Sequence, residues 1–151
     1  MTLTIGDTVP PFKLPVSEEH FLSPNDFKGK KLVIYFYPKD NTPGCTIEAG
    51  DFRDHQKTFE TKNTAIIGIS KDSLRKHKNF SDKLALNFPL GSDEETQVCE
   101  DFGVWVEKSM YGKKYMGIER STFLVNESGH IEKIWRKVKV KDHVKEVLEA
   151  L

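Results

Sequence analysis

The stretch 31–59, KLVIYFYPKDNTPGCTIEAGDFRDHQKTF, decides the fold that we expect for this chain. Residues 32–37 are apolar throughout, which is typical of a central strand with helices over both faces. A turn follows, and Pro43 suits the opening of a helix because its φ is already helical and the N–H that it lacks would have no partner there. The next apolar positions keep a helical spacing: Cys45, Ala49, Phe52 and Phe59. The stretch therefore predicts a buried strand, a tight turn and an amphipathic helix over 43–60.

The thiol of Cys45 falls in the first turn of this predicted helix. Backbone N–H groups have no intrahelical partner there, and the helix dipole has its positive end at the same point. Both effects favour the thiolate over the thiol. We therefore treat Cys45 as a candidate nucleophile.

The composition is that of a globular protein. The 151 residues are 37% hydrophobic and 30% charged, which predicts one domain over 1–151. Basic and acidic residues number 23 each, so net charge favours neither a nucleic-acid nor a membrane partner. The N-terminus has no signal-peptide pattern, and no window approaches the roughly 18 apolar residues of a membrane span. Two cysteines make no disulfide framework, so we expect a thiol-reducing, cytoplasmic setting.

Hydrophobic periodicity divides the rest of the chain into strands and helices. Strands are predicted at 64–70, 88–90, 122–125 and 131–140, and helices at 72–84, 93–102 and 142–151. The glycine-rich segment 103–120 is interpreted as a hairpin or a long connection that delivers Arg120 to the head of a strand. This order predicts an α/β, thioredoxin-like fold with a central mixed β-sheet flanked by helices on both faces.

Four positions predict a peroxide-reducing site. Cys45 would be the nucleophile, and the hydroxyl of Thr42, in the same turn, would bond the sulfur or a bound oxygen. Pro38 ends the strand and would shield the pocket from water. Arg120 would hold the thiolate by charge and supply several fixed donors. The chain has only four arginines, and the other three fall in predicted helices or an exposed strand, which makes Arg120 the candidate.

The reaction needs side chains of these types. A thiolate attacks one peroxide oxygen while negative charge builds on the departing one, and losing one donor aimed at that oxygen typically costs about 3 kcal/mol. An ordinary thiol is only a few per cent ionised at about pH 7, and a helix N-terminus and a cationic partner would raise the fraction of thiolate. The product on Cys45 would be a sulfenic acid, which a second thiol must reduce.

The segment 38–46, PKDNTPGCT, resembles the peroxiredoxin active-site signature, with a Thr three residues before the Cys. The similarity covers nearly the whole chain, including GDTVPPFKLP, GKKLVIYFYPKDNTPGCTIEA and FGVWVEKSMYGKKYMGIERSTFLV. Its details resemble the Q-type branch, the bacterioferritin comigratory proteins. The resemblance implies an antioxidant thioredoxin-fold peroxidase, a monomer, with no metal or flavin and with the four positions above as the active set. Glu48 matches a residue often found in this branch one turn below the Cys.

The chain departs from that branch at the second, resolving cysteine. Many Q-type members carry it five residues after the first, where this chain has Gly50, and others carry it near Ser81. Cys99 is the only other thiol in the sequence, and its apolar neighbours favour an inert, inward-facing side chain. We therefore favour a one-cysteine cycle in which thioredoxin, glutaredoxin with glutathione, or another low-molecular-weight thiol reduces the sulfenic acid. A disulfide to Cys99, within or between chains, is the alternative.

Two other functional classes fit a thioredoxin-like fold. A disulfide oxidoreductase of thioredoxin type would need a CxxC motif, and the residues around Cys45 offer one thiol only. A non-enzymatic chaperone or interaction module would need no reactive thiolate. The histidines show no ligand spacing with either cysteine, which disfavours a metal site, and the alternation of Lys137 and Lys139 with valines favours a half-buried strand. The sequence thus favours a thiol peroxidase acting on hydrogen peroxide and small organic hydroperoxides.

Overall fold

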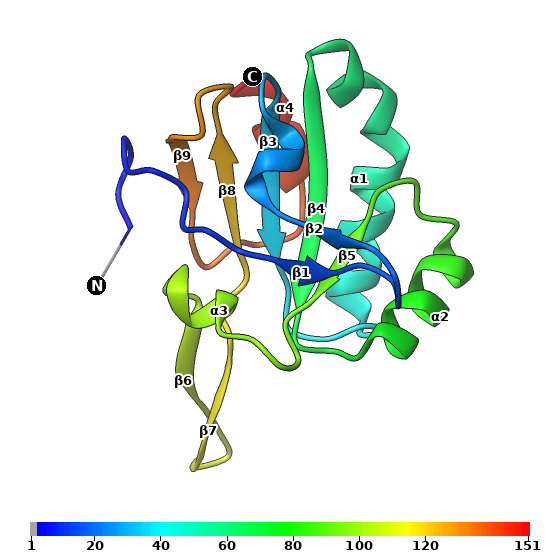
Figure 1. The fold of residues 1–151 in the computed structure, drawn as a ribbon. Coiled ribbons are helices and arrows are strands. Elements are labelled where there is room, and N and C mark those ends of the chain that lie inside the picture. Colours follow the sequence, from blue (N-terminus) through cyan, green and yellow to red (C-terminus); the bar gives the residue numbers. More distant parts are fainter. Residues whose placement is uncertain (1–2) are drawn as a thin grey trace.

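The computed structural model describes residues 3–151 (Figure 1). The strands are β1 (Leu14–Pro15), β2 (Phe21–Leu22), β3 (Lys31–Phe36), β4 (Thr64–Ser70), β5 (Leu90–Ser92), β6 (Trp105–Met110), β7 (Lys113–Ile118), β8 (Ser121–Val125) and β9 (Ile131–Trp135). The helices are α1 (Pro43–Thr61), α2 (Leu74–Leu84), α3 (Val98–Asp101), α4 (His143–Glu149) and the 3-10 helix η1 (Pro24–Phe27). No helix within residues 3–151 has the length and apolar character needed to cross a bilayer.

Five strands form one mixed sheet in the order β5-β4-β3-β8-β9. β4 runs parallel to both β3 and β5, with α1 and α2 as the crossovers, whereas β8 is antiparallel to β3 and β9. Phe36 at the end of β3 pairs with Ser121 at the start of β8, so the residue before β8 lies beside the point where β3 ends. The predicted thioredoxin-like fold, with a mixed sheet between helices, is confirmed (Figure 1).

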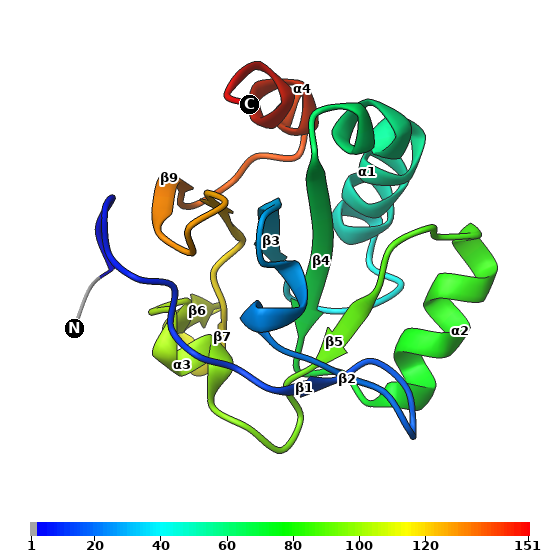
Figure 2. The ribbon, with the colours of Figure 1, turned by 45° about the horizontal axis from the view of Figure 1, so that its top comes forward.

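The two faces of the sheet bury separate clusters because successive side chains of a strand point to opposite faces. From β3, Tyr35 faces α1, α2 and α4, in a cluster that also contains Cys45. Ile34 and Phe36 point the other way, into a cluster that contains Cys99 of α3. Figure 2 shows α1, α2 and α4 on one side of the sheet and α3 on the other. The two sulfur atoms therefore belong to different faces of the sheet.

The helix predicted over 93–102 is mostly absent, since only the short α3 forms there. The Asp93 carboxylate accepts hydrogen bonds from the backbone N–H groups of Val98 (3.0 Å) and Cys99 (2.8 Å), and from the Thr96 hydroxyl. Lys71 lies 3.3 Å from the same carboxylate. The Asp93 carboxylate therefore stabilises a loop before α3 and accepts hydrogen bonds from the first N–H groups of that helix.

The strand predicted over 131–140 ends at Trp135, so the expected half-buried strand with alternating lysines is wrong. Lys137 has a φ of 49°, which is incompatible with an extended strand. The N–H of Val138 then donates to the carbonyl oxygen of Arg120 (3.0 Å). This bond keeps the segment after Trp135 next to Arg120, in an irregular conformation instead of a strand.

Three predicted boundaries also shift. α2 begins at Leu74, because the Ser73 side chain accepts a hydrogen bond from the N–H of Lys76 and caps the helix there. The short strand expected at 88–90 is β5, two residues further on, and α4 occupies only the central part of the predicted helix at the C-terminus.

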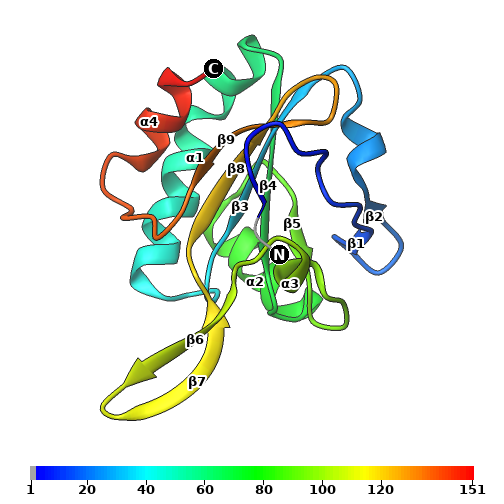
Figure 3. The same ribbon diagram turned by 90° about the vertical axis from the view of Figure 1, so that its left-hand side faces the viewer.

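The glycine-rich segment forms the β6–β7 hairpin, one of the two alternatives expected for it. Tyr111 and Gly112 turn the chain with positive φ values of 52° and 80°. The hairpin projects from the body of the molecule (Figure 3). At its base the N–H of Glu119 donates to the carbonyl oxygen of Val104 (2.7 Å), which fixes the chain just before Arg120.

The packing around two glycines gives a test of this fold. A Cβ at Gly68 would lie 2.8 Å from the Tyr35 ring and 2.9 Å from Leu90, so Gly68→Ala should destabilise the protein by about 1–3 kcal/mol through overpacking. A Cβ at Gly50 would meet nothing nearer than the Arg53 guanidinium at 3.7 Å, so Gly50→Ala should stabilise α1 by up to about 1 kcal/mol. Urea unfolding of both variants measures these changes; equal effects would contradict the packing described here.

Candidate active site

The turn after β3 and the first turn of α1 place the Cys45 thiol. Asn41 adopts a left-handed conformation (φ 64°), which Asn tolerates better than most residues. Pro43 is the first residue of α1, as the sequence predicts, and Thr42 is its N-cap residue. Cys45 follows within the first helical turn and is only 1% exposed. Its sulfur thus lies at the positive end of a long helix.

Arg120 reaches this sulfur from the position directly before β8. Its Nη2 lies 3.3 Å from Cys45 Sγ, and its Nη1 donates to Glu48 Oε1 at 2.6 Å. The β3–β8 register sets this approach, because it brings the residue before Ser121 next to the turn that leads into α1. The predicted proximity of Arg120 and Cys45, distant in the sequence, is confirmed. Gly44 makes room for the guanidinium, since a Cβ there would lie 3.2 Å from Nη2.

Glu48 lies one turn below Cys45 and is completely buried. Burial raises the pKa of its carboxyl to about 7, although the Arg120 guanidinium opposes the rise. Among residues 3–151, Glu48 Oε2 has no hydrogen-bond partner, and neither does the buried Tyr35 hydroxyl. Burial also raises the pKa of the Tyr35 phenol well above its ordinary value, and the Glu48 carboxylate adds to the rise. The Arg120 guanidinium therefore contacts two acidic groups, the Cys45 thiol and the Glu48 carboxyl.

Thr42 does not bond the Cys45 sulfur, one of the two partners expected for its hydroxyl, and a bond to a bound oxygen stays a prediction. Its hydroxyl donates to the Lys39 carbonyl oxygen (2.7 Å), so its single proton is not directed at the Cys45 sulfur. The bond closes the turn before α1 and leaves the hydroxyl lone pairs free to act as acceptors. Pro38 is half-buried and lies two residues after the end of β3, and its role as a wall against water stays a prediction.

Cys99 is not brought to Cys45. It is fully buried in α3, on the opposite face of the sheet. Burial raises the pKa of the Cys99 thiol, and the Asp93 carboxylate raises it further. Gly50 of α1 and Ser81 of α2, where Q-type relatives would place a second cysteine, supply no thiol.

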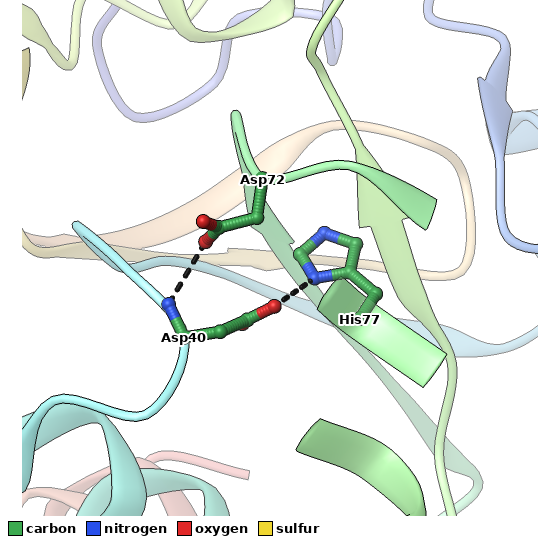
Figure 4. A group of neighbouring side chains, drawn as sticks. All are labelled: Asp40, Asp72 and His77. Atoms are coloured by element: carbon green, nitrogen blue, oxygen red, sulfur yellow. Dashed lines mark hydrogen bonds and ion pairs between the residues drawn. The ribbon is translucent and has the colours of Figure 1, made fainter. Parts of the chain in front are cut away.

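Sequence reasoning missed a buried polar cluster beside the turn. It consists of Tyr37, Asp40, Asp72 and His77, and Figure 4 shows the last three. Oxygen and nitrogen atoms of Asp40, Asp72 and His77 lie within 4.8 Å of one another, a spacing suited to a metal ion, and neither cysteine belongs to this group. The available signals were an Asp inside the turn and a His on the apolar face of the helix predicted over 72–84.

The geometry at Cys45 suits attack by sulfur on an electrophile that gains negative charge. The Arg120 guanidinium presents several donors at fixed angles, and it is only 16% exposed. By helix geometry, the N–H groups of Gly44 and Cys45 have no intrahelical acceptor. A small molecule that reached the buried sulfur would meet a cation and the N–H donors of the first helical turn, and such donors act strongly where water is excluded.

Comparison with known proteins agrees with this site. Residues 5–134 match the AhpC/TSA family. The chain therefore belongs to the AhpC/TSA family of peroxiredoxins. It is 50% identical over 151 residues to a putative peroxiredoxin bcp of Coxiella burnetii, covering 100% of both chains. It is also 50% identical over 151 residues to peroxiredoxin Bcp of Bacillus subtilis, covering 100% of this chain and 96% of that protein.

Solved structures point to the same branch. The bacterioferritin comigratory protein of Xanthomonas campestris, described for its alkyl peroxide reduction activity, has a TM-score of 0.87 and 45% identity over 92% of this chain and 88% of that one. Peroxiredoxin Q of Xylella fastidiosa has a TM-score of 0.90 and 40% identity, covering 99% and 95% of the two chains. The resemblance to Q-type peroxiredoxins is thus confirmed.

The raised pKa of Glu48 predicts a specific pH dependence of stability. A carboxyl whose pKa rises from its ordinary 4.5 to about 7 on folding stabilises the folded state below pH 4.5, and this stabilisation is lost as the pH rises to about 7. The stability of the wild type relative to Glu48→Gln should therefore fall by up to about 3 kcal/mol over this range. Urea unfolding of both proteins across the range measures it. Parallel profiles would show that Glu48 titrates normally.

Proposed function

We propose that this protein reduces hydrogen peroxide and small organic hydroperoxides through attack of the Cys45 thiolate. The observation that carries the proposal is the 3.3 Å contact between Cys45 Sγ and Arg120 Nη2, at the N-terminus of α1. The guanidinium and the helix dipole both stabilise negative charge at that point. The family membership, and the alkyl peroxide reduction described for the Xanthomonas campestris relative, support the same chemistry.

The reaction places each group in a defined role. The thiolate attacks the terminal oxygen of a hydroperoxide, an S–O bond forms, and the O–O bond breaks with its electron pair leaving on the second oxygen. Arg120 and the free N–H groups of the first turn hold the charge that builds on that oxygen. The Thr42 hydroxyl accepts from the peroxide O–H, since its own proton is donated to Lys39. The products are a Cys45 sulfenic acid and an alkoxide or hydroxide, which takes a proton from water.

The sulfenic acid returns to a thiol through an external reductant. Thioredoxin, glutaredoxin with glutathione, or another low-molecular-weight thiol would attack the Cys45 sulfur, release water and form a mixed disulfide that a second external thiol resolves. The position of Cys99 across the sheet supports this one-cysteine cycle. We further propose that residues 1–151 act as one domain, a monomer in the cytoplasm, where such reductants keep thiols reduced.

Kinetics of three variants test the proposed roles. Cys45→Ser should abolish peroxide turnover. Arg120→Lys keeps the charge but loses the fork that reaches both Cys45 and Glu48, so it should lower kcat/KM by roughly 100- to 1000-fold. Cys99→Ser is the matched control and should keep the wild-type rate of oxidation. Stopped-flow peroxide consumption with a thiol reductant measures all three, and fast turnover by Cys45→Ser would refute the proposal.

The one-cysteine cycle makes its own prediction. After one equivalent of peroxide without reductant, the intact mass should rise by one oxygen, because no thiol on the Cys45 face of the sheet can condense with the sulfenic acid. Intact mass spectrometry distinguishes this product from its alternatives. A loss of two hydrogens would indicate an internal disulfide to Cys99, and a doubled mass a linked dimer.

A further inference from the structure

A second set of buried polar groups lies beside the turn that carries the active site. The Asp40 carboxylate accepts from the Tyr37 hydroxyl at 2.6 Å and lies 2.7 Å from His77 Nδ1. His77 projects from α2 and is only 2% exposed, and Asp40 is 6% exposed (Figure 4). Burying two polar side chains is costly unless their polar atoms form hydrogen bonds. The mechanism proposed above does not use either residue.

Counting the hydrogen-bond donors shows how tightly this pair is held. His77 Nε2 lies 3.1 Å from the carbonyl oxygen of Gly91, which can only accept, so Nε2 carries a proton. The Asp40 oxygen at Nδ1 also needs a proton between the two atoms, carried either by the ring or by the carboxyl. A neutral imidazole beside an ionised Asp40 would therefore lose one of its two bonds. Through these two bonds His77 links the turn to both α2 and β5.

The backbone of the turn is held at the same residue. The N–H of Asp40 donates to Asp72 Oδ2 at 2.8 Å, and the Ser70 hydroxyl donates to the same oxygen at 2.7 Å. Asp40 is thus fixed through its side chain and its main chain by groups that follow β3 in the sequence. The next residue, Asn41, adopts its left-handed conformation, and Thr42 then opens α1. Any shift of Asp40 would move the start of α1, and with it the Cys45 sulfur.

We propose that His77, acting through Asp40, is a positioning residue of the peroxidase site, which sets the place of the Cys45 sulfur against Arg120. This proposal rests on the proposed function. The ligand-like spacing of Asp40, Asp72 and His77 does not change it, because every one of these side chains already has hydrogen-bond partners within the protein. The bonds account for the cluster without an ion.

Two variants distinguish the effect of the His77 hydrogen bonds from the effect of the packing of its ring. His77→Phe keeps a ring of similar size but removes the bond from Asp40 Oδ2 to the ring and the donor of the Gly91 carbonyl oxygen, so the turn should shift. Asp40→Asn keeps every bond, since the amide can donate to a neutral His77 and still accept from Tyr37. Misplacement of a reacting group by about 1 Å can cost about 100-fold in rate. We expect His77→Phe to slow oxidation of Cys45 by about 10- to 100-fold, and Asp40→Asn to stay close to the wild type.

The measurement is the second-order rate constant for oxidation of reduced protein by hydrogen peroxide, from rapid mixing and intact mass. It is made at a temperature at which circular dichroism shows each variant to be folded. Phe59→Leu, at the far end of α1, is the control for lost stability, because Phe59 is fully buried but remote from the turn. It should lower the melting temperature and leave the rate constant unchanged.

Each outcome has one meaning. Wild-type oxidation by folded His77→Phe would overturn the positioning role, and so would equal slowing in Phe59→Leu at a matched loss of melting temperature. Slowing of Asp40→Asn to the level of His77→Phe would overturn the account based on hydrogen bonds. Failure of the proposed function is seen separately, as peroxide turnover that survives Cys45→Ser.

Discussion

The guanidinium of Arg120 joins the parts of the molecule that make the site. One nitrogen contacts the Cys45 sulfur at 3.3 Å and another the Glu48 carboxylate at 2.6 Å. Because the donors of a guanidinium have fixed angles, both contacts hold only while β8 and α1 keep their relative position. The pairing of Phe36 with Ser121 secures that position, since it sets Arg120 beside the end of β3. The contact between Arg120 and Cys45 therefore requires a central sheet with this register.

The surroundings of this cation are arranged so that its charge is shared. Glu48 is fully buried, and burial raises the pKa of its carboxyl to about 7 even beside a guanidinium. When Glu48 is protonated, the positive charge of Arg120 is left to the sulfur, and when Glu48 is ionised the two anions share it. On the other side of the sheet, burial raises the pKa of the Cys99 thiol, and the Asp93 carboxylate adds to the rise. Of the two thiols, Cys45 therefore lies against a guanidinium and Cys99 beside a carboxylate.

Much of this could be predicted from local pattern. The apolar run of β3, the proline that opens α1 and the thiol in its first turn depend on residues close together in the chain, and these predictions hold. The failures have a different origin. Asp93 bonds the N–H groups of Val98 and Cys99, and Val138 bonds the carbonyl oxygen of Arg120, so the loop and the irregular segment at these places follow from particular polar partners. Hydrophobic periodicity carries no information about such pairs.

By itself, the sequence determined the class of fold and the candidate cysteine and arginine of the site, because periodicity and turn chemistry record which residues are buried and where a helix begins. Only the tertiary structure decided how closely Arg120 approaches Cys45, on which face Cys99 lies, and that His77 meets Asp40. These are relations between segments far apart in the chain. Sheet register and helix packing create them, and neither can be read from one segment alone.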